Sequence, residues 1–432
     1  MTPGAAFRTL VHGAVGDRVD MQQRETEYRA IRPWSSLLVR DFRLIWSASV
    51  LAAIASQIRN VASLYQVYQL SGSSFQLGLT GFFQALPHVV FGLFAGALAD
   101  AFDRKKLLAV TYGLHLLPTL ALGFLTQTGT IQVWHVYVFS LISSFIEVFS
   151  WPARSAIIPR LVPASYLMNA ITLNSMVLQS SFLVGPAIAG IIIDYFNLPL
   201  SYFSSVVLLV PAIVAVGAVR SSGRPEGERR RVSFRSMIEG VEFIWMQRII
   251  LSLFLLDFGV TLVGFYRPIL PIFAASVFKM GATGLGILYA APAVGSLLGS
   301  ISLLMAGDLK RKGSAAVVAG IFFAASLALL GLSKWFWMAV AAVAILGFTD
   351  SISVAIRRTV VQLLAPDTMR GRAASLITVF AQSTNALGAL LAGTASEFIG
   401  APNALVLGSV LCLLMIFGIS RAIPQLWSYR SQ

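Results

Sequence analysis

Long apolar runs recur twelve times along the chain, and short polar segments separate them. Each run is close to the roughly 20 residues that a helix needs to cross a lipid bilayer. The runs cover residues 44–69, 75–99, 107–125, 132–151, 167–193, 200–219, 249–276, 284–306, 314–332, 337–356, 373–396 and 404–423. The pattern predicts an all-α membrane protein with twelve transmembrane helices. An even number of crossings places both termini on the same side.

The second half of the chain repeats the first. Glu147 and Asp350 lie 203 positions apart, as do Arg154 and Arg357, whereas Arg59 and Arg267 nearer the start of each half lie 208 apart. Such a repeat predicts two pseudo-symmetric six-helix bundles, with a substrate site between them near the middle of the membrane. The predicted division is a tail at 1–43, bundles at 44–219 and 249–423, a linker at 220–248 and a tail at 424–432.

The basic residues lie almost entirely at alternate ends of the runs. Of the 32 Lys and Arg residues, 28 fall on the side of the termini, and the opposite side holds only Lys279 and Lys334. Cytoplasmic loops carry an excess of Lys and Arg. The asymmetry therefore predicts a multi-pass protein of the plasma (inner) membrane with both termini in the cytoplasm. Residues 233–247 of the linker can form an amphipathic helix on that surface.

Composition excludes several classes of protein. The chain is 57% hydrophobic and 12% charged, with a mean hydropathy of +0.78, whereas soluble domains carry about 25% charged residues. The net charge of +14 does not indicate nucleic-acid binding, because the basic residues lie at the ends of apolar runs. One Cys, four scattered His and no phosphate-binding loop predict no enzyme, metal or cofactor. Transport would therefore depend on an existing gradient.

The segment 96–108, GALADAFDRKKLL, joins the second run to the third and resembles a signature of the major facilitator superfamily. The matching residues are Gly96, Leu98, Ala99, Asp100, Arg104 and Lys105, whereas Ala101 and Asp103 depart from the family pattern. Segments 67–87, 151–170, 185–190 and 369–376 resemble the efflux branch that includes enterobactin and macrolide exporters.

This resemblance implies a secondary active transporter that works by alternating access and exports a small organic molecule using an ion gradient. Anionic, siderophore-like and drug-like compounds are the candidate substrates, protons are the candidate coupling ion, and membrane lipids surround the protein. A passive facilitator or an importer on the same fold is the alternative. We expect a monomer, because one chain already contains both halves.

Charged residues inside the apolar runs are the candidate functional groups, because charge is costly in a membrane. Glu147 and Asp350 are each followed seven residues later by Arg154 and Arg357. This spacing resembles the intracellular salt-bridge network of sugar porters, which implies a gate; static anchoring is the alternative. By the same analogy Asp100 and Arg104 form a latch against the end of the eleventh helix.

Asp257 in the seventh run is the candidate proton carrier and also a candidate substrate-binding residue, and a fixed ion pair with Arg59 or Arg267 is the alternative. Pro268 and Pro271 should break that helix in its outer half. Arg59 and Arg267 resemble the paired arginines of organophosphate antiporters, which implies a grip on an acidic substrate group. The alternative is that each reaches the outer headgroups or pairs with an acid. Tyr65 either lines an aromatic part of the cavity or packs in the core.

Overall fold

The computed structural model describes residues 33–221, 242, 245–307, 309, 311–366 and 370–428, with the side chains of 93–101, 370–375, 377, 426 and 428 outside that description. Twelve helices of 17 residues or more are found in this part of the chain. They are α2 (Arg40–Ser71), α3 (Ser74–Ala101), α4 (Arg104–Gln127), α5 (Val133–Leu161), α6 (Leu167–Tyr195), α7 (Leu198–Gly217), α9 (Arg248–Gly264), α11 (Gly281–Ala306), α12 (Lys312–Gly331), α13 (Phe336–Leu364), α14 (Arg370–Ile399) and α15 (Ala401–Ala422). Most of the predicted tail at 1–43, of the linker at 220–248 and of the predicted amphipathic helix lies outside the described residues.

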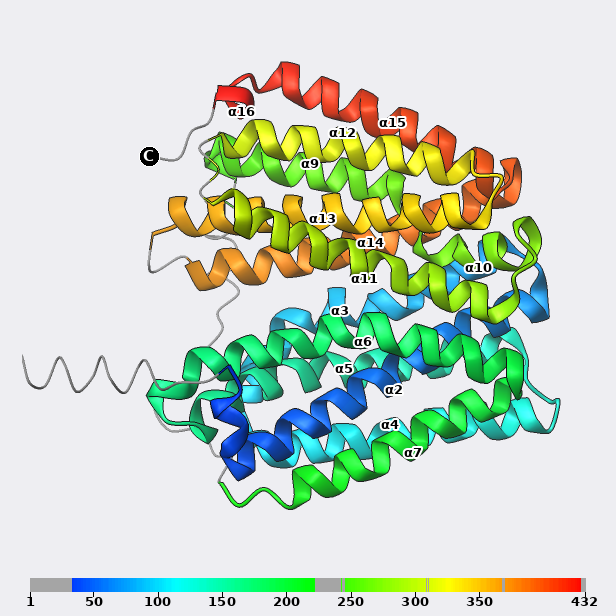
Figure 1. Ribbon diagram of the computed structural model, residues 1–432, viewed down its shortest axis with the longest axis vertical. Helices are drawn as coiled ribbons and strands as arrows, with labels where there is room; N and C mark the ends of the chain where they lie inside the picture. Colours follow the sequence, from blue (N-terminus) through cyan, green and yellow to red (C-terminus); the bar gives the residue numbers. More distant parts are fainter. Residues whose placement is uncertain are drawn as a thin grey trace, which may run out of the picture.

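The helices form two bundles that lie side by side (Figure 1). Helices α2 to α7 form the N-terminal bundle, and α9 to α15 form the C-terminal bundle. Successive helices run in opposite directions. We call the end where α2 begins and α15 finishes the terminal end, on the left of Figure 1, and the opposite end the far end.

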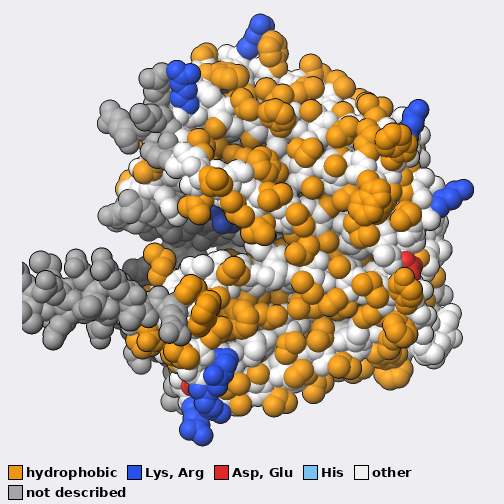
Figure 2. Space-filling view, viewed as in Figure 1, with side chains coloured by type: hydrophobic (Ala, Val, Ile, Leu, Met, Phe, Trp, Pro, Cys, Tyr) orange, Lys and Arg blue, Asp and Glu red, His pale blue; other side chains and the backbone are white. Residues whose placement is uncertain are grey.

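Apolar side chains cover the visible face of both bundles, and Lys and Arg side chains lie at its margins (Figure 2). Leu117, Val207 and Phe322 are among the large apolar residues with more than half of their surface exposed. Water does not favour such a surface, but lipid does. Ten helices in the described part of the chain are long and apolar enough to cross a membrane. With α3 and α14, of 28 and 30 residues, they complete the predicted set of twelve.

The seventh crossing is broken, as its two prolines predict. Helix α9 ends at Gly264 and is followed by a 3₁₀ turn (η3, Arg267–Ile269), a short helix (α10, Leu270–Ile272) and a π-helical turn (η4, Phe273–Val277). Proline cannot donate the backbone hydrogen bond that a continuous α-helix requires. The break lies toward the far end, next to Arg267.

Two helix pairs join the bundles, α3 with α14 and α6 with α11. Glycine permits a close approach at both. A Cβ on Gly78 of α3 would lie 2.6 Å from the carbonyl oxygen of Ala389, and one on Gly286 of α11 would lie 2.4 Å from that of Pro186. Small residues at such crossings let two helix backbones touch. These contacts lie in the half of the molecule nearer the far end.

Two carboxylates strengthen the junction at the far end. Asp194 at the end of α6 accepts hydrogen bonds from the backbone N–H groups of Ala282 (2.9 Å) and Thr283 (2.6 Å), at the start of α11. Glu397 at the end of α14 accepts from Phe75 N–H and Ser73 Oγ, at 3.0 Å each, at the start of α3. Each bundle therefore caps a helix of the other. At the terminal end, by contrast, Figure 2 shows a hollow between the bundles.

Candidate functional site

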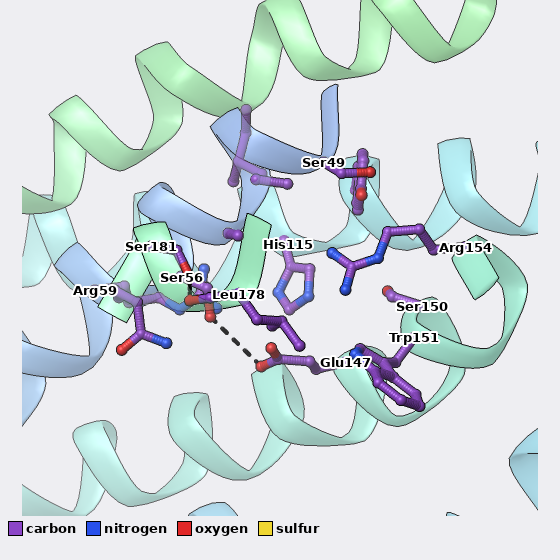
Figure 3. Close-up of a pocket in the computed structure, with 15 residues that line it drawn as sticks. Ser49, Ser56, Arg59, His115, Glu147, Ser150, Trp151, Arg154, Leu178 and Ser181 are labelled. Atoms are coloured by element: carbon purple, nitrogen blue, oxygen red, sulfur yellow. Dashed lines mark hydrogen bonds between the residues drawn. The ribbon is translucent and has the colours of Figure 1, made fainter. Parts of the chain in front are cut away.

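A cavity of about 60 Å³ lies inside the N-terminal bundle (Figure 3). Its lining comes from α2, α4, α5, α6 and α7, so every lining residue belongs to one bundle. The polar residues that matter here are Ser49, Ser56, Arg59, His115, Glu147 and Arg154. Three residues predicted from the sequence, Arg59, Glu147 and Arg154, therefore meet at one site.

Arg59 is 6% exposed and donates a hydrogen bond from Nη1 to Thr119 Oγ1 at 3.2 Å. It lies 19 positions beyond the first residue of α2, or roughly 28 Å along the helix. Glu147 is the carboxylate whose charge acts on it. Arg59 therefore lies deep in its own bundle. No contact in the described part of the chain joins it to Arg267.

Glu147 of α5 lies between the two arginines of the cavity. It accepts a long hydrogen bond from Ser56 Oγ at 3.5 Å, and its charge acts on both Arg59 and Arg154. Among the described residues, neither arginine has a carboxylate oxygen within 4.0 Å. Glu147 therefore attracts both groups without forming a close ion pair with either.

Arg154 is 6% exposed and directs its guanidinium toward the imidazole of His115 (Figure 3). Its Nε and Nη2 atoms have no hydrogen-bond partner in the described part of the protein, and neither has Nδ1 of His115. Buried polar groups are nearly always hydrogen-bonded, so each exception needs an explanation. Both unpartnered groups line the cavity.

The equivalent charges of the C-terminal bundle are arranged differently. Asp257 of α9 forms an ion pair with Arg357 of α13. The sequence alternative paired Asp257 with Arg59 or Arg267, whereas the partner in the structure is Arg357. The charges of Asp257, Arg357 and Arg267 all act on Asp350, whose side chain is exposed although it lies in the middle of α13.

Arg267 lies where the two bundles meet. Its guanidinium stands over the ring of Phe182 in α6, 5.4 Å from the ring centroid, and its backbone oxygen accepts from Tyr289 OH at 2.8 Å. Tyr65 is within electrostatic reach of Asp194, which places it toward the far end. Tyr65 and Arg267 thus lie apart from the cavity of Figure 3.

The predicted latch is described only in part. Arg104 donates from Nη1 to the backbone oxygen of Ala156 in α5, at 3.1 Å. The side chain of Asp100 lies outside the described residues. Asp103, a departure from the family pattern, caps α4 by accepting from the backbone N–H groups of Lys105 (3.0 Å) and Lys106 (3.2 Å).

Sequence reasoning missed three residues beside these charges. His115 and Ser56 line the cavity, and Thr119 accepts the hydrogen bond of Arg59. His115 is one of the four scattered histidines, and a single His gives no pattern along the sequence. No group of three or more His, Cys, Asp or Glu residues that could hold a metal is present in the described ranges.

Residues 31–429 match the family described as transmembrane secretion effectors. The chain belongs to this family, within the major facilitator superfamily. It is 23% identical over 392 residues to the enterobactin exporter EntS of Shigella boydii serotype 18, with 87% of this chain and 92% of that protein covered. Two solved structures share the fold. One is an inward-facing, unoccupied bacterial homologue of the human lysosomal transporter Spinster, with a TM-score of 0.71 and 15% identity over 93% of this chain and 100% of that chain. The other is the nucleoside transporter NupG, with a TM-score of 0.64 and 12% identity over 90% of this chain and 100% of that chain.

This membership makes the chain a membrane transporter with a small-molecule substrate, and not an enzyme. Its apolar helices embed it as a multi-pass protein of the inner membrane. The predicted superfamily and helical fold are both confirmed.

Proposed function

We propose that the protein is a secondary active exporter of a small organic molecule, driven by an ion gradient and working by alternating access. The main support for this proposal is the sequence similarity to an enterobactin exporter, which is 23% identical over 87% of this chain. The arrangement of the bundles supports it, because they meet at the far end and leave a hollow at the terminal end. With the termini in the cytoplasm, as the basic residues predict, this hollow faces the cytoplasm.

The gate in this proposal consists of Glu147, Arg154, Asp350 and Arg357. In the structure the charges lie within their own bundles, as a state with the terminal end apart would require. Closing that end would bring the two sets together and pair them across the bundles. Asp100 and Arg104 would complete the latch at the same end.

Asp257 is the proposed site of proton coupling. Its carboxylate holds Arg357, which is also a gate residue. A proton on Asp257 would remove the negative charge and release Arg357 for a partner in the other bundle. Proton binding and closure of the terminal end would then be linked through one arginine.

The substrate proposal is an acidic or catecholate-like group held by Arg59 and Arg267, with Tyr65 nearby. Arg267 already lies between the bundles, over Phe182. Arg59 would have to leave Thr119 and turn toward the interface when the substrate binds. Arg267→Gln should therefore weaken binding without altering the N-terminal cavity, and Arg267→Lys should not restore a two-point grip.

The test is uptake into inside-out vesicles containing the purified protein, with a catecholate siderophore as the first probe. An imposed proton gradient should drive accumulation in the wild type, whereas Asp257→Asn should retain only downhill movement. Glu147→Gln, which keeps the shape of the side chain, should slow both gradient-driven accumulation and downhill movement. Equal rates with and without the gradient would identify a passive facilitator and overturn active export. Unchanged accumulation in Asp257→Asn would exclude that residue as the carrier.

A further inference from the structure

The two bundles differ in how the arginines of their apolar helices are neutralised: Arg59, Arg154 and Arg357 are buried and Arg267 is half-buried. In the C-terminal bundle Asp257 pairs with Arg357, and Asp350 is a second carboxylate on which the charges of Arg357, Arg267 and the exposed Arg358 act. In the N-terminal bundle the equivalent arginines, Arg59 and Arg154, share Glu147 alone. One positive charge of the N-terminal bundle therefore has no carboxylate of its own in the described part of the protein.

The repeat identifies the position where the second acid would stand. Ser49 lies 208 positions before Asp257, the same offset that relates Arg59 to Arg267. Ser49 lines the cavity beside Arg154, as its equivalence to Asp257 beside Arg357 requires. Its hydroxyl donates to the backbone oxygen of Ile45 at 2.7 Å and brings no charge.

Other described carboxylates of the bundle are engaged elsewhere. Asp41 accepts from Ser221, Asp103 caps α4, and Asp194 caps α11. Arg154 keeps Nε and Nη2 without a partner, although it is more than nine-tenths buried. Arg357 also keeps Nε without one, but Arg357 has the Asp257 carboxylate beside it. An unpaired buried charge is costly, and proteins rarely retain one without a compensating ion.

The cavity has the size and the donors for such an ion. Its volume of about 60 Å³ exceeds the roughly 10–15 Å³ of comparable space that one water needs. Arg154 offers Nε and Nη2, and His115 offers a ring nitrogen. Glu147 is the opposing group, and its negative charge limits the site to a single small anion.

We infer that the N-terminal bundle binds a small monovalent anion, such as chloride, between Arg154, His115 and Ser49. The anion takes the place that the Asp257 carboxylate occupies beside Arg357. A short organic carboxylate shares this chemistry, whereas a large anion such as gluconate does not fit. The lining of the site comes from the N-terminal bundle alone, and the site shares Arg154 and Glu147 with the proposed gate.

The experiment measures thermal unfolding of the purified full-length protein in detergent, by tryptophan fluorescence, at constant ionic strength. Replacing gluconate by chloride or bromide should raise the midpoint temperature by about 2–4 °C and saturate with concentration. A parallel titration with acetate distinguishes an organic carboxylate from a halide as the preferred ion. No transport is measured, so failure here leaves the exporter proposal standing.

The variants follow from the repeat. Ser49→Asp should raise the midpoint in gluconate and abolish the response to chloride, because it supplies the missing carboxylate. Ser49→Asn, of equal size and without charge, is the matched control and should keep the response. Arg154→Gln should lose the rise of the midpoint temperature in chloride. Asp257→Ser should show an additional rise, because it removes the carboxylate beside Arg357.

Two results would overturn the inference. The first is a wild-type midpoint that is equal in gluconate, acetate, chloride and bromide. The second is a chloride response that persists in both Ser49→Asp and Arg154→Gln. If Ser49→Asp does not fold, Arg154→Gln and a bromide soak of crystals decide the matter: an anomalous peak beside Arg154 is expected, and its absence at saturating bromide counts against the site.

Discussion

At the scale of single residues, the buried charges decide which groups can act. Asp257 and Arg357 form one ion pair, whereas Arg59 and Arg154 share the more distant Glu147. A charge in a low-dielectric interior acts over a longer range than one in water, so these groups cannot be treated separately. Substituting any one of these charged residues should therefore also change the electrostatic environment of its charged neighbours.

Asp257→Asn should destabilise the protein by about 3–5 kcal/mol, because the charge of Arg357 is left buried without a partner. Arg357→Gln in the same background should recover part of the loss. A double-mutant cycle by thermal unfolding should give a coupling of roughly 0.5–3 kcal/mol. Additive effects of the two substitutions would contradict a direct pair.

At the scale of helices, glycines set how closely the bundles approach at the far end. Gly78→Ala and Gly286→Ala each place a methyl group against a backbone carbonyl of the opposite bundle. Backbone cannot be displaced as a flexible side chain can, so the two helices must separate. Overpacking of this kind costs about 1–3 kcal/mol.

Both glycine variants should therefore shift the population toward a state that is open at the far end. The measurement is the distance between spin labels on α6 and α11 near that end. Gly113→Ala is the matched control, because nothing lies within 4 Å of a Cβ added at that helical position. Equal distance distributions in Gly286→Ala and Gly113→Ala would show that this crossing does not limit opening.

The helix caps at the far end also belong to this scale. Asp194→Ala should weaken closure by about 0.5–2 kcal/mol, the usual value of an N-cap, and Glu397→Ala should act similarly from the other crossing. Accessibility of a cysteine placed at Thr130 would not change, whereas one placed at Ser276 should be labelled faster. Unchanged labelling at Ser276 in the double variant would argue that the caps do not hold the far end.

At the scale of the whole molecule, the distribution of basic residues predicts the orientation in the membrane. Cys412 is buried and is the one cysteine of the chain, so single-cysteine variants are simple to interpret. In a Cys412→Ala background, a cysteine at Arg311 should be labelled only from the cytoplasm and one at Thr130 only from outside. Labelling of both from one side would contradict the predicted topology.

The sequence by itself determined the membrane-spanning fold and the family. Twelve apolar runs, the repeat and the broken seventh helix follow from hydropathy, spacing and proline chemistry, which act locally along the chain. The repeat also marked the residues that carry buried charge. Aligning Ser49 with Asp257 needs only the offset of 208, so even the charge imbalance was available from the sequence.

Only the tertiary structure decided which of those charges meet. The partner of Asp257 is Arg357, 100 positions later, and His115 joins Arg154 across two helices. These contacts depend on how each helix is rotated and displaced against its neighbours. Close packing at glycine crossings fixes that rotation, and no local pattern along the sequence specifies it. The cavity beside Arg154 exists for the same reason.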